Sequence, residues 1–243
     1  MKILVIGESC LDVFHYGKCV RLCPEAPVPV FNSVETKENG GMAMNVHANV
    51  KSINENVDIL TNPNWKDIKK TRFVEIHSNH MFMRLDENDR QYGKFSFDKE
   101  VVMNYDAIIV SDYDKGFLEI QDLIDISTSH PLTFLDTKKT LSEWSSNFSF
   151  VKINGVEYGK TLHTITEKMR ENLIITQGQS GCIFKGRVFQ VPFVEVKDVS
   201  GAGDTFISAL CCEYVETRDI EASIEFANDC ATKVVQKKGV STI

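Results

Sequence analysis

Short apolar runs recur along the chain, and each of them ends on a polar residue or a glycine. The runs cover residues 3–6, 107–110, 133–135, 151–153 and 173–175. Continuous apolar runs of this length are typical of strands that are buried on both faces of a parallel sheet. Ligands of open α/β sheets bind beyond the carboxyl ends of the strands. The polar residues that follow the runs therefore predict a site along one edge of the sheet.

Two segments with half-exposed strand character interrupt this series of apolar runs. Residues 12–36 contain two strand-like runs on either side of a proline-rich turn, and residues 71–86 predict a hairpin. We expect them to form a small β lid on a single domain that spans residues 1–243. Helical spacing of apolar residues follows Asp204 and recurs near the C-terminus.

Composition and charge exclude several classes of protein. The chain has 243 residues, of which 42% are hydrophobic and 25% charged, as in ordinary globular proteins. Its formal net charge of −7 argues against a general nucleic-acid binder. No apolar run approaches the roughly 20 residues of a membrane span, and the N-terminus predicts a strand instead of a signal peptide. Seven cysteines without a secretory signal indicate reduced thiols, so we predict a cytoplasmic protein that binds neither nucleic acid nor membrane.

The segment DVSGAGD over residues 198–204 carries the strongest chemical signal. Gly201, Ala202 and Gly203 let the backbone approach a ligand, and the amides that open the following helix have no partners within it. Such a helix start binds anions. Asp204 adds a carboxylate within reach of the anion. An anion hole beside a general base suits the transfer of a phosphoryl group to a hydroxyl.

Two further motifs have both a functional and a structural interpretation. Asn154 and Glu157 directly follow a strand and could order Mg²⁺ through its water ligands, or they could simply cap a helix. Gly40, Gly41 and Asn45 precede a helical pattern and could contact sugar hydroxyls, although a turn before a helix explains the motif better when it is taken alone.

Several charged residues are candidates for holding a substrate. Asp12 follows the first strand and could accept hydrogen bonds from hydroxyls, or it could be a solvated loop carboxylate. Arg72, Arg84 and Lys138 could hold a substrate phosphate, although each one alone is more often a surface charge.

Taken in order, these motifs resemble those of the ribokinase-like (PfkB) carbohydrate kinases. The similarity runs from Val5 to Thr242 and rests on the DVSGAGD segment and on three further motifs, namely Gly40-Gly41 with Asn45, Asn154 with Glu157, and Thr176 with Gly178. Within the family, residues 21–30, 109–116, 226–228 and 238–242 are similar to the heptose-7-phosphate kinases. The resemblance implies a three-layer α/β/α sandwich with a mostly parallel central sheet and a small β lid.

The resemblance also implies an ATP- and Mg²⁺-dependent enzyme. Asp204 would be the base, and the amides of residues 201–203 would stabilise the transferring γ-phosphoryl group. Asn154 and Glu157 would position Mg²⁺ through the water molecules that the ion keeps as ligands. The remaining implied contacts are Thr176, Gly178 and Asn228 for ATP, and Asp12, Gly41 and Asn45 for the sugar. A monovalent cation such as K⁺ is implied near Asp198 and Ser241.

The chain also departs from this family. Between Asn62 and Thr71 it is much shorter than its relatives, so we expect a shortened N-terminal half. The resemblance implies phosphorylation of the anomeric hydroxyl of a heptose 7-phosphate. Another sugar or sugar phosphate as acceptor, such as ribose or fructose, and a non-catalytic nucleotide- or sugar-binding relative remain alternatives. Because exposed lid strands need a partner, we expect a homodimer through the lid.

Overall fold

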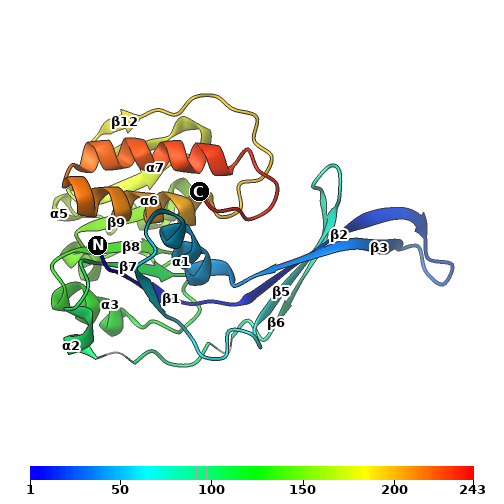
Figure 1. Ribbon diagram of the computed structural model, residues 1–243, viewed down its shortest axis with the longest axis horizontal. Coiled ribbons are helices and arrows are strands. Elements are labelled where there is room, and N and C mark those ends of the chain that lie inside the picture. The colour runs from blue at the N-terminus through cyan, green and yellow to red at the C-terminus, as the bar shows by residue number, and fades with distance from the viewer. Residues whose placement is uncertain (91, 97) are drawn as a thin grey trace.

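The computed structural model describes residues 1–90, 92–96 and 98–243, which form an α/β body with a projecting β arm (Figure 1). The strands of the body are β1 (Ile3–Gly7), β4 (Val57–Leu60), β7 (Ala107–Asp112), β8 (Thr133–Thr137), β9 (Phe150–Asn154), β10 (Leu173–Thr176), β11 (Cys182–Phe184) and β12 (Arg187–Phe189). They form one sheet in the order β12-β11-β10-β9-β8-β7-β1-β4. The strands from β4 to β10 in this order run parallel, and the β11–β12 hairpin adds an antiparallel edge.

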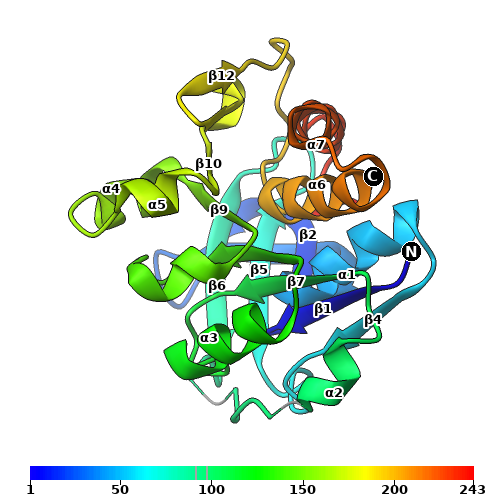
Figure 2. The ribbon, with the colours of Figure 1, turned by 90° about the vertical axis from the view of Figure 1, so that its left-hand side faces the viewer.

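Helices cover both faces of this sheet (Figure 2). One face carries α1 (Gly41–Ile53), α6 (Ala202–Thr217) and α7 (Ile220–Val234). The other carries α2 (Lys99–Val102), α3 (Ile120–Ser129), the 3₁₀ turn η1 (Glu143–Asn147), α4 (Gly155–Thr161) and α5 (Glu167–Arg170). In β1, Ile3 and Val5 pack toward the first layer, whereas Leu4 and Ile6 pack toward the second. This confirms the three-layer sandwich with a mostly parallel sheet.

The buried environment of the central strands explains their sequences. Every residue of β1 and of β7 is buried, so both faces need apolar side chains and the usual alternation with polar residues is lost. Helix α6 buries Ile207, Leu210 and Cys211 in the same core that α1 and α7 enter. This packing fixes the start of α6 against the carboxyl edge of the sheet.

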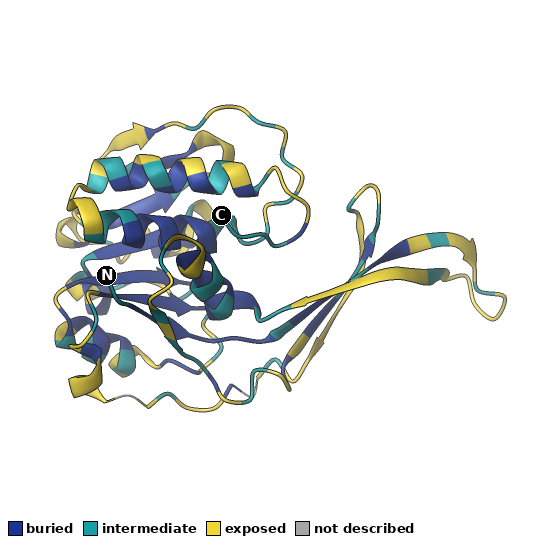
Figure 3. Cartoon of the chain, in the orientation of Figure 1, coloured by how far each residue is buried: buried dark blue, intermediate teal, exposed yellow. Residues whose placement is uncertain are grey.

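The β arm is a second sheet with the strand order β3-β2-β5-β6. Its strands are β2 (Leu11–Leu22), β3 (Pro29–Asn39), β5 (Lys69–Glu75) and β6 (Met81–Glu87). β2 and β5 run parallel at the centre, and each forms an antiparallel hairpin with its outer neighbour. The base of the arm is buried, whereas much of its outer part is exposed, including Val20, Leu22 and Val34 (Figure 3).

The N-terminal half of the sheet is short, as the sequence predicts. β4 forms the edge beside β1, and the chain then passes through residues 61–68 directly into β5 of the arm. The body therefore ends at β4 on this side.

Across the described residues, no helix combines the length and the apolar character that a membrane crossing requires.

Candidate active site

The glycine-rich turn starts α6 at the carboxyl edge of the sheet. Gly201 precedes the helix with a φ of 83°, a left-handed conformation that favours glycine. A Cβ atom on Gly201 would lie 2.8 Å from Nδ2 of Asn45, and one on Gly203 would lie 2.7 Å from Nζ of Lys152. Both glycines thus allow polar side chains to approach the helix start. The amide of Ala202 already donates to the carbonyl of Val199 at 3.2 Å, so the anion hole depends on the neighbouring amides.

Asp204 lies in the first turn of α6 and is buried. Its Oδ2 accepts a hydrogen bond from Nδ2 of Asn45 at 2.7 Å, and its Oδ1 accepts one from the hydroxyl of Tyr113 at 3.0 Å. Burial raises the pKa of Asp204 to about 6, against the opposing effect of the Asn45 donor. The carboxylate is therefore ionised at neutral pH, yet close enough to its pKa to accept a proton.

A buried ion pair lies next to this carboxylate. Nζ of Lys152 on β9 contacts Oδ2 of Asp136 on the neighbouring β8 at 2.8 Å, and both side chains are almost fully buried. Within the described part of the chain, Oδ1 of Asp136 has no hydrogen-bond partner. Asp136 raises the pKa of Asp204, whereas Lys152 lowers it. Sequence reasoning missed Lys152, although a lysine within an apolar strand two residues before Asn154 was a usable signal.

A polar cleft of about 400 Å³ opens beside Asp204. It brings together the base and nearly all the substrate-binding candidates, which are Asp12, Gly41, Asn45, Arg72, Arg84 and Lys138, together with Gly201. Gly40 lies just outside this lining, and a Cβ atom there would meet the side chain of Met44. Gly41 itself has a φ of 52°, and a Cβ atom on it would lie 3.1 Å from Oδ2 of Asp12.

The cleft also contains residues that sequence reasoning missed. They include Asn39, Met42, Lys70, Tyr113 and Lys115. Tyr113 and Lys115 belong to the segment 109–116 that resembles the heptose kinases, so that segment held the signal for them. Lys70 had no such signal, because only the pairing of β5 with β2 brings it to the cleft. The cleft therefore carries five basic side chains in a protein whose net charge is −7.

The Asn154 and Glu157 pair caps helix α4. Oδ1 of Asn154 accepts from the amides of Val156 and Glu157 at 2.9 and 3.0 Å, and Oε2 of Glu157 accepts from the amide of Asn154 at 2.7 Å. Nζ of Lys138 contacts Oε1 of Glu157. Burial lowers the pKa of Lys138, but nearby carboxylates, including Asp136 and Glu157, outweigh it and raise the pKa overall. The capping interpretation is thus confirmed, and the Mg²⁺ role stays a prediction.

These residues are compatible with a magnesium ion that keeps its water ligands. Among the residues that the structure describes, no three His, Cys, Asp or Glu side chains are grouped to hold a metal by themselves. Mg²⁺ usually retains several waters and binds one or two carboxylates together with substrate phosphates. Asn154 and Glu157 lie at the carboxyl end of β9 with side-chain oxygens of that kind, which in this structure accept hydrogen bonds within the cap and, at Glu157, contact Lys138.

An apolar cavity of about 170 Å³ lies on the other side of the α6 start. Its lining includes the predicted nucleotide-binding residues Thr176, Gly178 and Asn228, together with Ala202, Gly203 and several valines of the loop 191–199. Gly178 opens the 3₁₀ turn η2 (Gly178–Ser180) after β10. Mostly apolar cavities with a few polar groups suit a flat organic ring such as a nucleobase. The start of α6 thus separates this apolar cavity from the polar cleft.

Comparisons with known proteins bear on the family and the fold of the chain. Residues 141–243 match the pfkB family of carbohydrate kinases. The bifunctional protein HldE of Helicobacter pylori strain J99 is 30% identical over 294 aligned residues, which cover 98% of this chain and 63% of that protein. HldE of Haemophilus influenzae strain PittEE is 30% identical over 292 residues, which cover 100% of this chain and 61% of that protein. The chain thus spans less than two thirds of these relatives, and the alignments are longer than its own 243 residues, consistent with the shortened N-terminal half.

Solved structures show the same fold. Ribokinase from Thermotoga maritima matches with a TM-score of 0.74 and 14% identity, covering 99% of this chain and 94% of that one. Arabidopsis thaliana ribokinase, complexed with ribose and ATP, matches with a TM-score of 0.66 and 16% identity, covering 98% and 93%. The chain thus has a ribokinase-like fold, and its residues 141–243 match the pfkB family of carbohydrate kinases.

Proposed function

We propose that this chain transfers the γ-phosphoryl group of ATP to a hydroxyl of a sugar bound in the polar cleft. The observation that carries this proposal is the position of Asp204, a buried carboxylate with a pKa of about 6, at the helix start between the two cavities. The nucleotide would occupy the apolar cavity, and its phosphates would point toward the amides that begin α6.

Asp204 would act as the general base. It would take the proton of the sugar hydroxyl while that oxygen attacks the γ-phosphorus in line, so no phosphoenzyme forms. Asn45 and Tyr113 would hold the carboxylate in place. Lys152 and the amides near Gly203 would stabilise the negative charge on the transferring group. Mg²⁺, when bound, would neutralise charge on the β- and γ-phosphates, with Asn154 and Glu157 orienting its water ligands.

The acceptor we propose is the anomeric hydroxyl of a heptose 7-phosphate. The similarity to the bifunctional HldE proteins and the cationic character of the cleft both support it. The alternative acceptor is another sugar or sugar phosphate, such as ribose or fructose. The short segment between Asn62 and Thr71 supports this alternative, because it changes the N-terminal half that forms the sugar site. We place the monovalent cation, such as K⁺, near the loops of Asp198 and Ser241.

We further propose a homodimer that forms through the β arm. Strands β3 and β6 are the two edges of the arm sheet, and exposed edge strands pair readily with another chain. The apolar side chains of Val34, Met83 and Leu85 are each about half exposed or more on these edges. A second copy of the chain would cover them.

The Asp204→Asn variant tests the kinase proposal. Loss of the base should lower kcat by about 10²–10⁴-fold in an ADP-release assay with a panel of sugars and sugar phosphates. ATP binding, measured by calorimetry, should stay within a few-fold of the wild type, because the apolar cavity is untouched. The matched variant Asp229→Asn changes an exposed carboxylate of α7 and should keep full activity. Near-normal turnover by Asp204→Asn would contradict the mechanism. Saturable ATP binding without a phosphorylated product from any sugar would favour a non-catalytic relative.

A further inference from the structure

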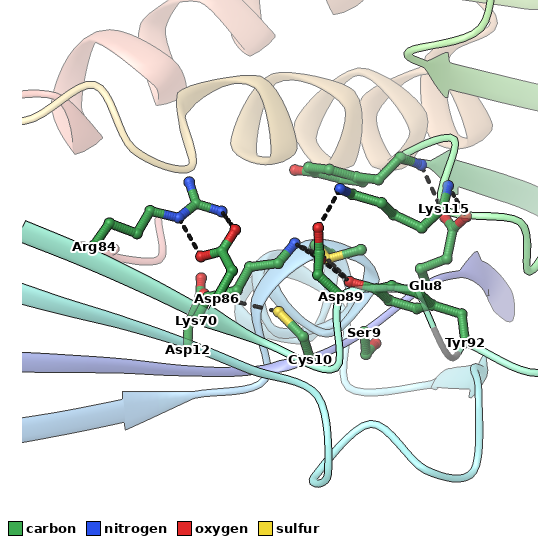
Figure 4. A network of polar contacts seen from close by, with 12 residues as sticks. Glu8, Ser9, Cys10, Asp12, Lys70, Arg84, Asp86, Asp89, Tyr92 and Lys115 are labelled. Atoms are coloured by element: carbon green, nitrogen blue, oxygen red, sulfur yellow. Dashed lines mark hydrogen bonds and ion pairs between the residues drawn. The ribbon is translucent and has the colours of Figure 1, made fainter.

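Two lysines of the polar cleft share a single carboxylate. Oδ2 of Asp89 contacts Nζ of Lys115 at 2.5 Å, and its Oδ1 lies 3.1 Å from Nζ of Lys70. The hydroxyl of Tyr92 donates to the same Oδ1 at 2.9 Å (Figure 4). Lys70, Lys115 and Tyr92, which come from three different segments, thus all contact the carboxylate of Asp89. The two lysines line the polar cleft.

The other basic side chains of the cleft each have a carboxylate of their own. Arg72 pairs with Asp12 at 2.8 Å, and Arg84 makes two hydrogen bonds to Asp86, at 2.6 and 2.9 Å. Lys138 contacts Glu157. Of the basic residues that line the cleft in the described part of the chain, Lys70 and Lys115 therefore keep one positive charge between them that Asp89 does not balance.

Of these two lysines, Lys70 lies where water is scarce, whereas the side chain of Lys115 is 31% exposed. Lys70 is only 5% exposed, and its ammonium group also lies 3.6 Å from Sδ of Met42. A buried ammonium group is stable only when an anion or several hydrogen-bond acceptors face it. Two ammonium groups and a phenol hydroxyl can bind several oxygens of a phosphomonoester, which carries more negative charge than one carboxylate.

We propose that Lys70, Lys115 and Tyr92 form a subsite for a phosphate group on the acceptor sugar, and that Asp89 occupies this subsite when no substrate is bound. This inference rests on the proposed function, and it assigns the residues that hold the phosphate group of the proposed sugar phosphate acceptor. The incoming phosphate displaces Asp89 from the lysines. The subsite thus differs from Arg72 and Arg84, whose charges are already matched.

The competing interpretation is purely structural. In that case Asp89 ties the loop after β6 to the body, and the loss of any member of the network weakens binding in the same direction. Competition between Asp89 and phosphate predicts opposite signs. Removing a lysine weakens phosphate binding, whereas removing the charge of Asp89 strengthens it.

Calorimetry without ATP separates these possibilities, with heptose 7-phosphate, the same heptose without phosphate, and inorganic phosphate as probes. The wild type should bind the phosphorylated heptose at least about tenfold more tightly than the neutral one. Lys70→Gln and Lys115→Gln should weaken binding of the phosphorylated heptose by about tenfold to a hundredfold and leave binding of the neutral heptose unchanged. Asp89→Asn should tighten binding of both phosphorylated probes several-fold. Lys94→Gln, at an exposed lysine outside the cleft, is the matched control.

Three results would overturn the subsite. They are equal affinity of the wild type for both heptoses, no binding of either phosphorylated probe, and weaker binding by Asp89→Asn in parallel with the lysine variants. ATP-dependent turnover is measured separately. Lysine-dependent binding without ADP release would contradict the proposed function and leave the subsite intact. Turnover of the phosphorylated heptose that is unaffected by the lysine variants would contradict the subsite and leave the kinase.

Discussion

Two hydrogen bonds to Asp204 oppose the effect of burial on its pKa, and they therefore influence the pH at which the proposed base works. Asn45→Leu removes the amide that donates to Oδ2 at 2.7 Å and keeps a similar side-chain volume. A hydrogen bond to a charged group contributes about 1.5–3 kcal/mol, and one pKa unit corresponds to about 1.4 kcal/mol. Because the amide stabilises the ionised form, its loss should raise the pKa of Asp204 by about one to two units from about 6.

The sign of the effect on activity follows from the role of the base. Asp204 must be ionised to accept the hydroxyl proton, so kcat/KM falls as the pH drops through its pKa. In Asn45→Leu this acidic limb should move to higher pH by the same one to two units. Tyr113→Phe, which removes the longer hydrogen bond of 3.0 Å, should shift the limb in the same direction by less.

The assay is kcat/KM from ADP release between about pH 5 and pH 9. Tyr105→Phe is the matched control, because it removes a hydroxyl that donates to Asp58 at 2.8 Å outside the polar cleft. Its profile should coincide with that of the wild type. If Asn45→Leu lowers the plateau and leaves the acidic limb in place, the titrating group is not Asp204 and the reasoning fails.

Three further predictions test other parts of the structure. Gly201→Ala places a residue with a φ of 83° under strain and brings a Cβ atom to 2.8 Å from Asn45, so the loss of about 1–2 kcal/mol should lower Tm by several degrees. Gly155→Ala, where a Cβ atom would meet nothing within 4 Å, should not lower it in the same thermal scan. Ala231→Phe should fill the apolar cavity and weaken ATP binding at least about tenfold in calorimetry, with sugar binding unchanged. Val34→Glu on the exposed arm should convert a dimer into monomers in sedimentation analysis, and a wild type that sediments as a monomer would rule out the arm dimer.

Much of the fold followed from local patterns in the sequence. The apolar runs predicted β1, β7, β8, β9 and β10, because strands buried on both faces need continuous apolar residues. Turn residues between alternating runs likewise predicted the two hairpins of the arm. The pairing of these hairpins into one sheet through β2 and β5 was not predictable in the same way, since it joins segments that are far apart in the chain.

The residues of the candidate site likewise fall into those that a local motif predicted and those that only the fold brought together. The motif around Asp204 predicts an anion hole with a base, because glycines and a carboxylate at a helix start favour that chemistry. The contact of Asn45 with Asp204 spans 159 residues, so neither the orientation of the base nor its raised pKa was visible beforehand. Lys70 was missed for the same reason, because only the pairing of β5 with β2 brings it to the cleft.

The charge balance of the polar cleft shows most clearly what the sequence predicted and what only the tertiary structure decided. The sequence was enough to identify the chemistry of phosphoryl transfer and the layered α/β architecture, because both depend on residue type and local spacing. Which basic residue is neutralised, and which keeps charge for a substrate, was decided only when the fold set the distances of Arg72 to Asp12 and of Lys70 and Lys115 to Asp89. Electrostatic interactions depend on separation and burial, and these are properties of the folded chain.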